Sequence, residues 1–253
     1  MINVIVTELF LEILIFCSKR ILNNSNEEGD TVKEYADETF WESAMRTKMG
    51  AYLTRMEMGF FLKAIDFRTT KMVCDVGAGA GKFTLRAVEE DAKVVALDID
   101  LHGLARLKVK NCEIDVIRAD ARALPLRDNL FDAAVSMEVV DYIPELDKVL
   151  VEGNRILKEG CPFVFSFGNL SSLKSKARQL SGKNYMHSYK EAIEDIRKTG
   201  FIIDKKMGFN WLPFNRTSEN RLIPFLAKVE RVFGLRRLPK WSPWVLIKAV
   251  KSN

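Results

Sequence analysis

The sequence is poor in the residues that build metal sites. It holds two histidines, His102 and His187, and four cysteines in 253 residues. No two cysteines stand in a CxxC spacing, and no spacing typical of a zinc site is present. We therefore expect no metal site, and we expect reduced cysteines of the kind found in cytosolic proteins.

Extremes of composition and charge are absent as well. The chain is 47% hydrophobic and 29% charged, which excludes a disordered tail, a fibrous repeat and a multi-span membrane protein. Its 39 basic and 34 acidic residues give a net charge of +5, too mild to indicate nucleic acid by itself. The length fits one large α/β domain with additions, or two small domains.

The first residues lack the marks of a cleaved signal or of a membrane span. Residues 1–17 are apolar, but no basic segment leads them and no small-residue cleavage site follows. They carry Glu8 and Glu12, and they are shorter than the roughly 20 apolar residues of a span. Polar residues recur on one helical face, so we expect an amphipathic helix and a polar linker, together residues 1–39. The helix can pack on the rest of the chain or lie on a membrane surface.

From Phe40 onward, β-rich runs alternate with helical periods, which is typical of parallel strands joined by helices. A helical stretch to about Ile65 comes first. We expect strands at Lys71–Val76, Lys93–Asp98, Cys112–Arg118, Phe131–Met137, Cys161–Gly168, Phe201–Phe209 and Trp244–Lys251. Between them, helices are expected to begin near Gly81, Asp100, Glu145 and Tyr189. Residues 40–253 are thus expected to form one α/β domain.

The first of these strands runs directly into a glycine-rich turn. KMVCDV is followed by Gly77-Ala-Gly79-Ala-Gly81 and then by a helical pattern. Glycine allows a tight turn and a close ligand approach, and the free N–H groups of a helix start attract phosphate or carboxylate. The G-x-G-x-x-G spacing of dinucleotide sites is absent, because Lys82 stands where the last glycine would. This spacing argues against NAD and against an oxidoreductase.

Two acidic residues follow the next two strands in register with this turn. Asp98 ends the second strand, where its carboxylate can accept hydrogen bonds from both hydroxyls of a ribose. Asp120 follows the third strand, where it can take the amino group of an adenine. Each acid alone could cap a helix. Together with the glycine turn they indicate a nucleoside site.

These segments resemble the class I S-adenosylmethionine-dependent methyltransferases, especially the small-molecule branch with the ubiquinone and menaquinone pathway enzymes. The resemblance covers roughly residues 73–168, in DVGAGAGKFT, VVALDID, IRADARALPLRDNLFDAAVSMEVVDYIP and the helix ending RILKEG. KTGFII, ahead of the sixth strand, is also typical of the family. The resemblance implies an α/β, Rossmann-like sheet of seven strands, with helices on both faces and the last strand antiparallel.

The resemblance also implies S-adenosylmethionine as the cofactor. The implied cofactor residues are Asp75, Gly77, Ala78, Gly79 and Gly81 for the methionine part, Asp98 for the ribose, Ile99, Asp120 and Ala121 for the adenine, and Met137 near the sulfonium. Methyl transfer is an in-line displacement at the sulfonium carbon. The protein therefore has mainly to align the acceptor with the methyl group and to exclude water.

Two residues are candidates for a catalytic base. In ubiquinone-type O-methyltransferases, Glu and His stand at the positions of Asp141 and Tyr142, in base or metal roles. Because Tyr142 replaces the histidine, no imidazole base is present at this position, and we expect Tyr142 to line the pocket. Asp141 stands one helical turn after Glu138, and we expect it to cap the next helix. His187 is the other candidate, although a lone histidine ahead of a helix is more often a cap or a surface residue.

Basic and aromatic residues are concentrated toward the C-terminus. Residues 205–253 hold eleven Lys and Arg against Glu219 and Glu230. Residues 210–243 are expected to form a substrate-side insertion with an amphipathic helix at Arg221–Phe233. This composition favours contact with an anionic surface, so we expect O-methylation of a small-molecule, lipid-linked or glycan-linked acceptor. A cytoplasmic protein that touches a membrane surface through residues 1–20 and 205–253 fits these features.

Two other functions stay open at this point. A noncatalytic, regulatory module that binds S-adenosylmethionine would keep the same glycine turn and the same acids. An RNA methyltransferase is disfavoured, because SMEVVDYIP stands where base-amine methylases of similar fold carry an Asn/Asp-Pro-Pro-aromatic motif. Nucleic acid is therefore not an expected partner.

Overall fold

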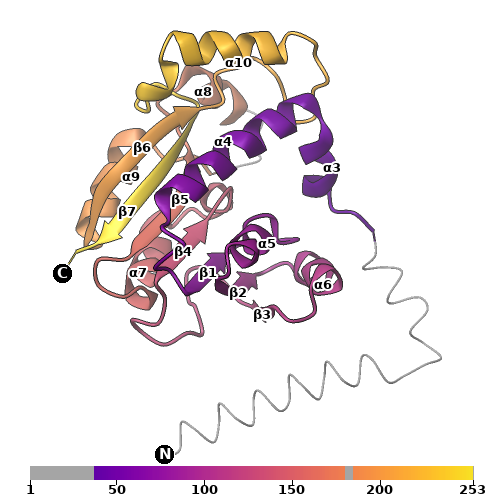
Figure 1. The fold of residues 1–253 in the computed structure, drawn as a ribbon. Coiled ribbons are helices and arrows are strands. Elements are labelled where there is room, and N and C mark those ends of the chain that lie inside the picture. Colours follow the sequence, from indigo (N-terminus) through magenta and orange to yellow (C-terminus); the bar gives the residue numbers. More distant parts are fainter. Residues whose placement is uncertain (1–36, 180–184, 253) are drawn as a thin grey trace, which may run out of the picture. The chain divides into compact units, whose positions relative to one another are not determined.

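Seven strands form one mixed sheet in the order β3-β2-β1-β4-β5-β7-β6 (Figure 1). The computed structural model describes residues 37–179 and 185–252. The strands are β1 (Met72–Val76), β2 (Lys93–Asp98), β3 (Asp115–Arg118), β4 (Ala133–Ser136), β5 (Pro162–Gly168), β6 (Phe201–Phe209) and β7 (Trp244–Lys251). Strands β1 to β5 pair in parallel, whereas β7 is antiparallel to both β5 and β6. The predicted sheet and its antiparallel last strand are confirmed.

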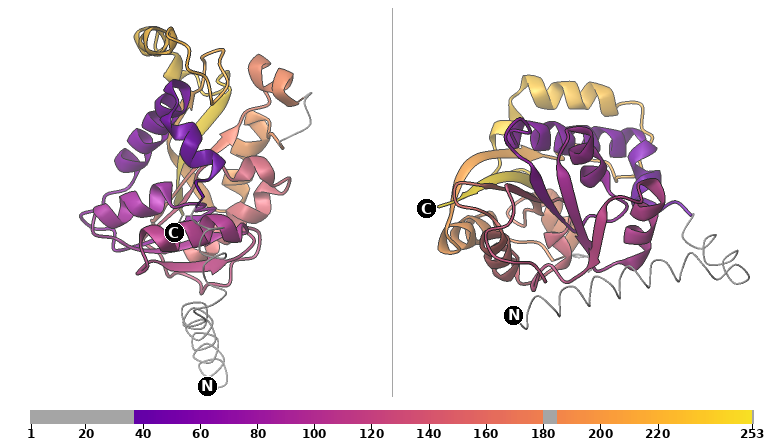
Figure 2. Two further views of the ribbon diagram at one scale, coloured as in Figure 1. Left: turned by 90° about the vertical axis from the view of Figure 1, so that its right-hand side faces the viewer. Right: turned by 60° about the horizontal axis from the view of Figure 1, so that its bottom comes forward.

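Helices cover both faces of this sheet (Figures 1 and 2). The helices are α3 (Phe40–Arg46), α4 (Lys48–Ala64), α5 (Lys82–Glu89), α6 (Leu101–Lys110), α7 (Leu146–Ile156), α8 (Leu173–Gln179), α9 (Tyr189–Lys198) and α10 (Ile223–Val232), with 3-10 turns η1 (Val140–Tyr142) and η2 (Leu235–Arg237). Apolar residues of α7 and α9 pack with Cys74 and Phe163 on one face. Those of α4 and α5 pack with Val73 and Val164 on the other face.

Several boundaries differ from the sequence predictions. The predicted third strand is shorter at its start, because the Asn111 side chain accepts a hydrogen bond from Glu113 N–H and turns the chain before β3. The long helical stretch from Phe40 is two helices, since Thr47 has extended backbone and its hydroxyl caps α4 by accepting from Gly50 N–H at 3.0 Å. Helix α8 was not predicted. The predicted N-terminal helix lies outside the described residues.

The order of the strands places a crevice at one edge of the sheet. β1 lies between β2 and β4, because the chain runs from β1 through β2 to β3 on one side and then crosses to β4 on the other side of β1. In open α/β sheets, ligands bind at the carboxyl ends of the strands where the strand order reverses. Within the described residues, no helix is long and apolar enough to cross a membrane.

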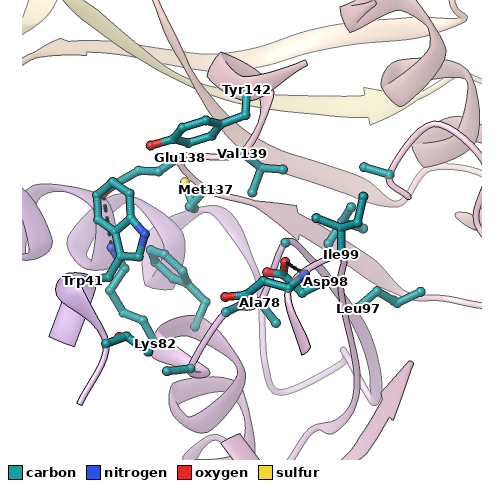
Figure 3. A pocket seen from close by; sticks show the side chains of 18 of the residues that line it. Trp41, Ala78, Lys82, Leu97, Asp98, Ile99, Met137, Glu138, Val139 and Tyr142 are labelled. Carbon is teal, nitrogen blue, oxygen red and sulfur yellow. Dashed lines mark hydrogen bonds and ion pairs between the residues drawn. The ribbon is translucent and has the colours of Figure 1, made fainter. Parts of the chain in front are cut away.

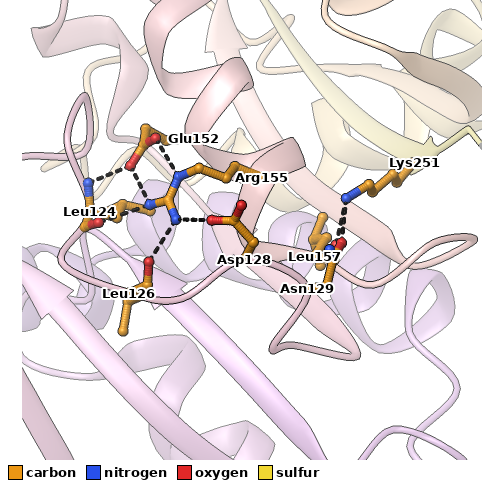
Figure 4. Close-up of polar contacts among 8 residues, drawn as sticks. All are labelled: Leu124, Leu126, Asp128, Asn129, Glu152, Arg155, Leu157 and Lys251. Carbon is orange, nitrogen blue, oxygen red and sulfur yellow. Dashed lines mark hydrogen bonds and ion pairs between the residues drawn. The ribbon is translucent and has the colours of Figure 1, made fainter. Parts of the chain in front are cut away.

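The loop between β3 and β4, which forms one side of this crevice, is fastened to α7 by one arginine (Figure 4). The Arg155 guanidinium donates to the carbonyls of Leu124 (2.9 Å) and Leu126 (2.6 Å). It also donates to the carboxylates of Asp128 (2.7 Å) and Glu152 (2.8 Å). A planar group with five donors can make this set of bonds, and a lysine cannot.

We expect Arg155→Lys to destabilise the fold by about 1–3 kcal/mol, because carbonyl groups of the loop would lose their donors. The free energy of unfolding, measured by denaturant titration, checks this. Arg127→Lys is the matched control, since Arg127 lies exposed on the same loop. An equal loss in both variants would contradict the role given to Arg155.

Candidate functional site

A pocket of about 580 Å³ lies at the carboxyl ends of β1, β2 and β4 (Figure 3). One end is formed by Leu97, Asp98 and Ile99, and Ala78 and Met137 lie near its middle (Figure 3). The other end is polar and includes residues of α3 and of the insertion before β7. The volume is that of a small-molecule site, which typically measures about 300–1,000 Å³.

The glycine turn forms the floor of this pocket with its backbone. Gly77 has φ +80°, and a Cβ atom there would lie 2.1 Å from a methyl carbon of Val139, so only glycine fits. The Gly77 and Ala78 N–H groups both donate to the Leu97 carbonyl, at 2.6 and 2.9 Å. Gly79 has φ +50° with open space above it. A ligand can therefore approach the backbone closely at Gly79.

Asp98 is held rigidly at the rim of the same pocket. One of its carboxylate oxygens accepts from Gly79 N–H at 2.7 Å, and the other accepts from Asp100 N–H at 2.9 Å. Each oxygen keeps a further lone pair that can accept a hydroxyl proton. Beside it, the Ile99 side chain is 62% exposed and offers a flat apolar surface at the pocket. Both residues thus line the pocket.

Asp120 and Ala121 also line the pocket, as predicted. The Asp120 carboxylate is already engaged, because the Arg122 side chain donates to it at 2.6 Å and the Arg122 N–H at 2.9 Å. Hydrogen bonding from Arg122 lowers the pKa of Asp120. Arg122 in turn donates to Glu145 at 2.9 Å. The remaining lone pairs of Asp120 are thus the ones that an adenine amino group could use.

Two predicted cofactor residues lie behind the pocket rather than on its wall. Asp75 is buried and accepts from the Thr84 hydroxyl at 2.5 Å, which fastens the start of α5 to β1. Burial raises the pKa of Asp75 to about 7, and the charge of Asp98 raises it further while the Thr84 hydroxyl opposes the shift. Gly81 is the N-cap of α5 and faces Leu107. Asp75 and Gly81 therefore fix the two ends of the glycine turn to β1 and α5.

The polar end holds a cluster of two acids and two cations, which we call the charged cluster: Glu57, Lys82, Glu138 and Arg216. Lys82 Nζ lies 2.7 Å from Glu57 Oε2 and 3.3 Å from Glu138 Oε1. Arg216 Nη2 lies 2.6 Å from Glu138 Oε2 and 3.9 Å from Glu57 Oε1. The Glu57 side chain is fully buried, and the other three line the pocket. Each cation is therefore shared between the two carboxyl groups.

Aromatic rings position Arg216 from two sides. Its guanidinium carbon lies 5.1 Å from the ring centre of Trp41 and 5.5 Å from that of Trp244. Such stacking on ring faces is favourable for a guanidinium. The sequence analysis missed Trp41, Glu57 and Arg216. Only Glu57 carried a signal, as the lone acid within the apolar helical run MEMGFF.

The segment after β4 differs from the prediction. Glu138 has φ +62°, so it is outside any helix and does not share a helical turn with Asp141. Asp141 is buried and accepts from Gly168 N–H at 2.6 Å, at the end of β5, so its predicted role as the cap of the next helix is wrong. Helix α7 begins after Glu145, which makes no side-chain capping bond.

The two predicted catalytic candidates lie in different places. Tyr142 lines the pocket, is half exposed, and lies above Glu138 and Met137 with its hydroxyl directed toward Trp41 (Figure 3). His187 is not a lining residue. It pairs with Asn169 beside the end of β5, and its Nε2 atom is buried. Among the described residues, no three histidine, cysteine or acidic side chains are grouped to hold a metal ion.

Comparison with known proteins agrees with this geometry. Residues 74–165 match the family described as Methyltransferase domain. The malonyl-[acyl-carrier protein] O-methyltransferase of Geobacter sulfurreducens is 33% identical over 134 residues, which cover 51% of this chain and 46% of that protein. Residues 74–165 therefore contain a methyltransferase domain, and the sheet has the fold of the class I S-adenosylmethionine-dependent methyltransferases. The demethylmenaquinone methyltransferase of Renibacterium salmoninarum is 39% identical over 107 residues, which cover 42% of this chain and 45% of that protein.

The fold of this methyltransferase domain also matches solved structures. The magnesium protoporphyrin IX methyltransferase of Synechocystis, with SAH bound, aligns with a TM-score of 0.60 at 15% identity. The alignment covers 90% of this chain and 96% of that one. The fold predicted from the sequence is confirmed. The chain spans about half the length of the two curated relatives named above.

Charge is unevenly distributed within the charged cluster of this domain. Burial and the charge of Glu138 raise the pKa of Glu57 to about 8, against the opposing effect of Lys82. Burial also disfavours ionised Glu138, but Lys82 and Arg216 outweigh it and lower the Glu138 pKa to about 2. The two opposite shifts favour a protonated Glu57 and an ionised Glu138 beside two cations. The cluster carries a surplus of positive charge.

Stability should fall as pH rises from 4.5, the ordinary pKa of Glu57, to about 8. In this window the unfolded chain has released the Glu57 proton and the folded chain retains it. Glu57→Gln resembles the protonated carboxyl group, so we expect the variant to lose this part of the pH dependence. Denaturant titrations across the pH range measure the slope. Exposed Glu113→Gln is the control, and an unchanged slope in Glu57→Gln would refute the assignment.

Proposed function

We propose that this chain transfers the methyl group of S-adenosylmethionine to an oxygen atom of a small-molecule or lipid-linked acceptor. One observation carries the proposal: a single pocket joins the glycine turn and Asp98 at one end to Trp41, Glu138 and Arg216 at the other. The first end suits a nucleoside, and the second suits a polar reacting group. Both relatives named above support methyl transfer to a small-molecule or carrier-linked acceptor, and the malonyl-[acyl-carrier protein] O-methyltransferase supports an oxygen acceptor.

The residues present fit the cofactor. The open space above Gly79, next to the fixed Asp98 carboxylate, leaves room for a ribose whose hydroxyls donate to that carboxylate. The exposed face of Ile99 offers an apolar surface for a flat base, and Ala121 lies on the same wall. The glycine turn lets the middle of the ligand cross the ends of the strands. These features together select an elongated nucleoside rather than a simple anion.

When bound, S-adenosylmethionine supplies a methyl group on a positively charged sulfur. What the chain itself contributes is alignment of the acceptor and exclusion of water, and such positioning can account for about 7–11 kcal/mol of the barrier. Tyr142 and Trp41 border the polar end and are placed to cover an acceptor there. Met137 lies between the two ends, near the point where transfer would occur.

The charged cluster favours an oxygen acceptor. With Glu57 protonated and Glu138 ionised, Lys82 and Arg216 leave one positive charge uncompensated at this end. Positive charge stabilises a carboxylate or a hydroxyl that is losing its proton, and it disfavours a cationic amine. An oxygen nucleophile is therefore the better match. A carboxylate acceptor needs no base at all, which suits a pocket that has no histidine among its lining residues.

Incubation of the chain with methyl-labelled S-adenosylmethionine and a fractionated cell extract tests the function. We expect label in the small-molecule or lipid fraction, bound through a linkage to oxygen. Label in the RNA fraction would contradict the proposal. Label in no fraction, with the cofactor bound, would favour a noncatalytic binding module.

The cofactor arm of this test is Asp98→Ala. We expect roughly 10- to 100-fold weaker cofactor binding by calorimetry, because hydrogen bonds to a charged group are lost, and the label transfer should be lost with it. Asp115→Ala is the matched control, since Asp115 is exposed at the far end of the neighbouring strand β3.

Substitution of the two catalytic candidates separates their roles. We expect Tyr142→Ala to reduce label transfer at least about tenfold while cofactor affinity changes little, because the acceptor end would lose its cover. His187→Ala should leave transfer unchanged, since His187 does not line the pocket. Steady-state kinetics of both variants give the answer. The reverse pattern would move the acceptor to the His187 side of β5.

A further inference from the structure

Helix α10 carries two apolar faces instead of one. Ile223, Leu226 and Ala227 face inward and pack in the core that includes α4. A second apolar stripe faces outward, which we call the outer stripe, formed by Leu222, Phe225, Val232 and Phe233, whose side chains are 57–74% exposed. Helices of globular proteins normally have one apolar face, and exposed apolar patches commonly mark a surface that binds a partner or a membrane. Figures 1 and 2 show α10 on the outer side of α4.

A cationic cavity of about 450 Å³ lies between α10 and α4. Its charged lining residues are all basic: Arg55 and Lys63 from α4, Lys228 and Arg231 from α10, and Arg236 from η2. Met56, Phe60 and Met207 give it an apolar floor. The cavity is separate from the nucleoside pocket, with which it shares no lining residue.

Most of this positive charge is not compensated. Arg236 has a carboxylate partner, Glu230, at 2.8 Å, and the Tyr52 hydroxyl donates to the same buried acid. Within the part of the chain that the structure describes, none of the other four cations forms an ion pair or a hydrogen bond with a side chain. Like charges held close together repel one another. A cavity that gathers four of them is therefore suited to an anion.

The outer stripe and the cationic cavity lie on neighbouring sides of one helix. At 100° per residue, Lys228 and Arg231 lie roughly 40–120° around α10 from Phe225 and Val232. Basic residues beside an apolar stripe are the pattern of a helix that lies in the interface of an anionic bilayer. Exposed Trp241, after η2, adds an aromatic side chain of the kind that is enriched at that interface.

We propose that α10 and the cationic cavity dock this protein on a membrane surface rich in anionic phospholipids. Headgroup phosphates would occupy the cavity, and the outer stripe would enter the boundary of the acyl chains. Charge complementarity favours this occupant over a second copy of the chain, because a symmetric contact would bring the same cations together. The docking does not depend on methyl transfer, so either idea can fail without the other.

Sedimentation with lipid vesicles tests the proposal on the full chain. We expect binding to vesicles of phosphatidylcholine with phosphatidylglycerol, weakening as salt rises, and far weaker binding to phosphatidylcholine alone. Lys228→Gln with Arg231→Gln should weaken vesicle binding about thirtyfold, because each of the two basic residues should contribute about fivefold to the affinity for an anionic surface. Phe225→Ser should weaken it about tenfold.

The matched controls are Lys93→Gln and Ile202→Ser, which change an exposed cation and an exposed apolar residue at the starts of β2 and β6. Both should bind vesicles as the unchanged chain does. Cofactor affinity should be the same in all variants and shows that each is folded. Binding of the Lys228→Gln, Arg231→Gln variant should also depend less steeply on salt than that of the unchanged chain, because two of the five cations of the cavity are removed.

Four results would overturn the proposal. The first is equal binding to neutral vesicles, and the second is vesicle binding that the α10 variants leave unchanged. The third is saturable binding of inorganic phosphate without any binding to vesicles, which would make the cavity a site for a free anion. The fourth is a dimer, seen by sedimentation without lipid, that Phe225→Ser dissociates.

Discussion

A carboxyl group buried in a protein is stable only where charges or hydrogen bonds replace its lost hydration, and Glu57 imposes this condition on the whole pocket. Its partners come from three other segments, because Lys82 opens α5, Glu138 follows β4 and Arg216 precedes α10. The contacts that stabilise the buried Glu57 carboxyl group therefore hold together α4, the start of α5, the end of β4 and the C-terminal insertion. Removing one partner of such a group typically costs about 3–5 kcal/mol, since the others are left buried with unbalanced charge.

Helix α4 connects the charged cluster to the cationic cavity, because it carries residues of both. Glu57 is buried beside Lys82, which lines the pocket, whereas Arg55 and Lys63 line the cationic cavity. The Tyr52 hydroxyl is bonded to Glu230, which is itself buried against Arg236, so α10 is fastened to α4 by a polar contact within an apolar layer. The cavity is thus formed before any ligand arrives, and the ordering cost of binding there is low.

The nucleoside end of the pocket could be predicted from the sequence because it depends on local chain geometry. The turn at Gly77 needs φ > 0 within a few residues, and Asp98 ends a strand whose pattern is visible in the sequence. The strands were predicted for the same reason, with errors where a side chain turns the backbone next to a strand, as at Asn111 before β3. The polar end depends on contacts between distant segments. Nothing near Arg216 in the sequence shows that it stacks between Trp41 and Trp244.

The segment after β4 shows how such a contact overrides local pattern. Its sequence, MEVVDYIP, is compatible with a helical turn that would put Glu138 and Asp141 on one face. Instead Glu138 adopts φ +62°, a conformation that costs a non-glycine residue about 1–2 kcal/mol. The Glu138 N–H donates to the Ser166 hydroxyl at 2.8 Å, and its carboxylate reaches Lys82 and Arg216. These buried ion pairs offset the strain, and they hold the Glu138 carboxylate at the wall of the pocket.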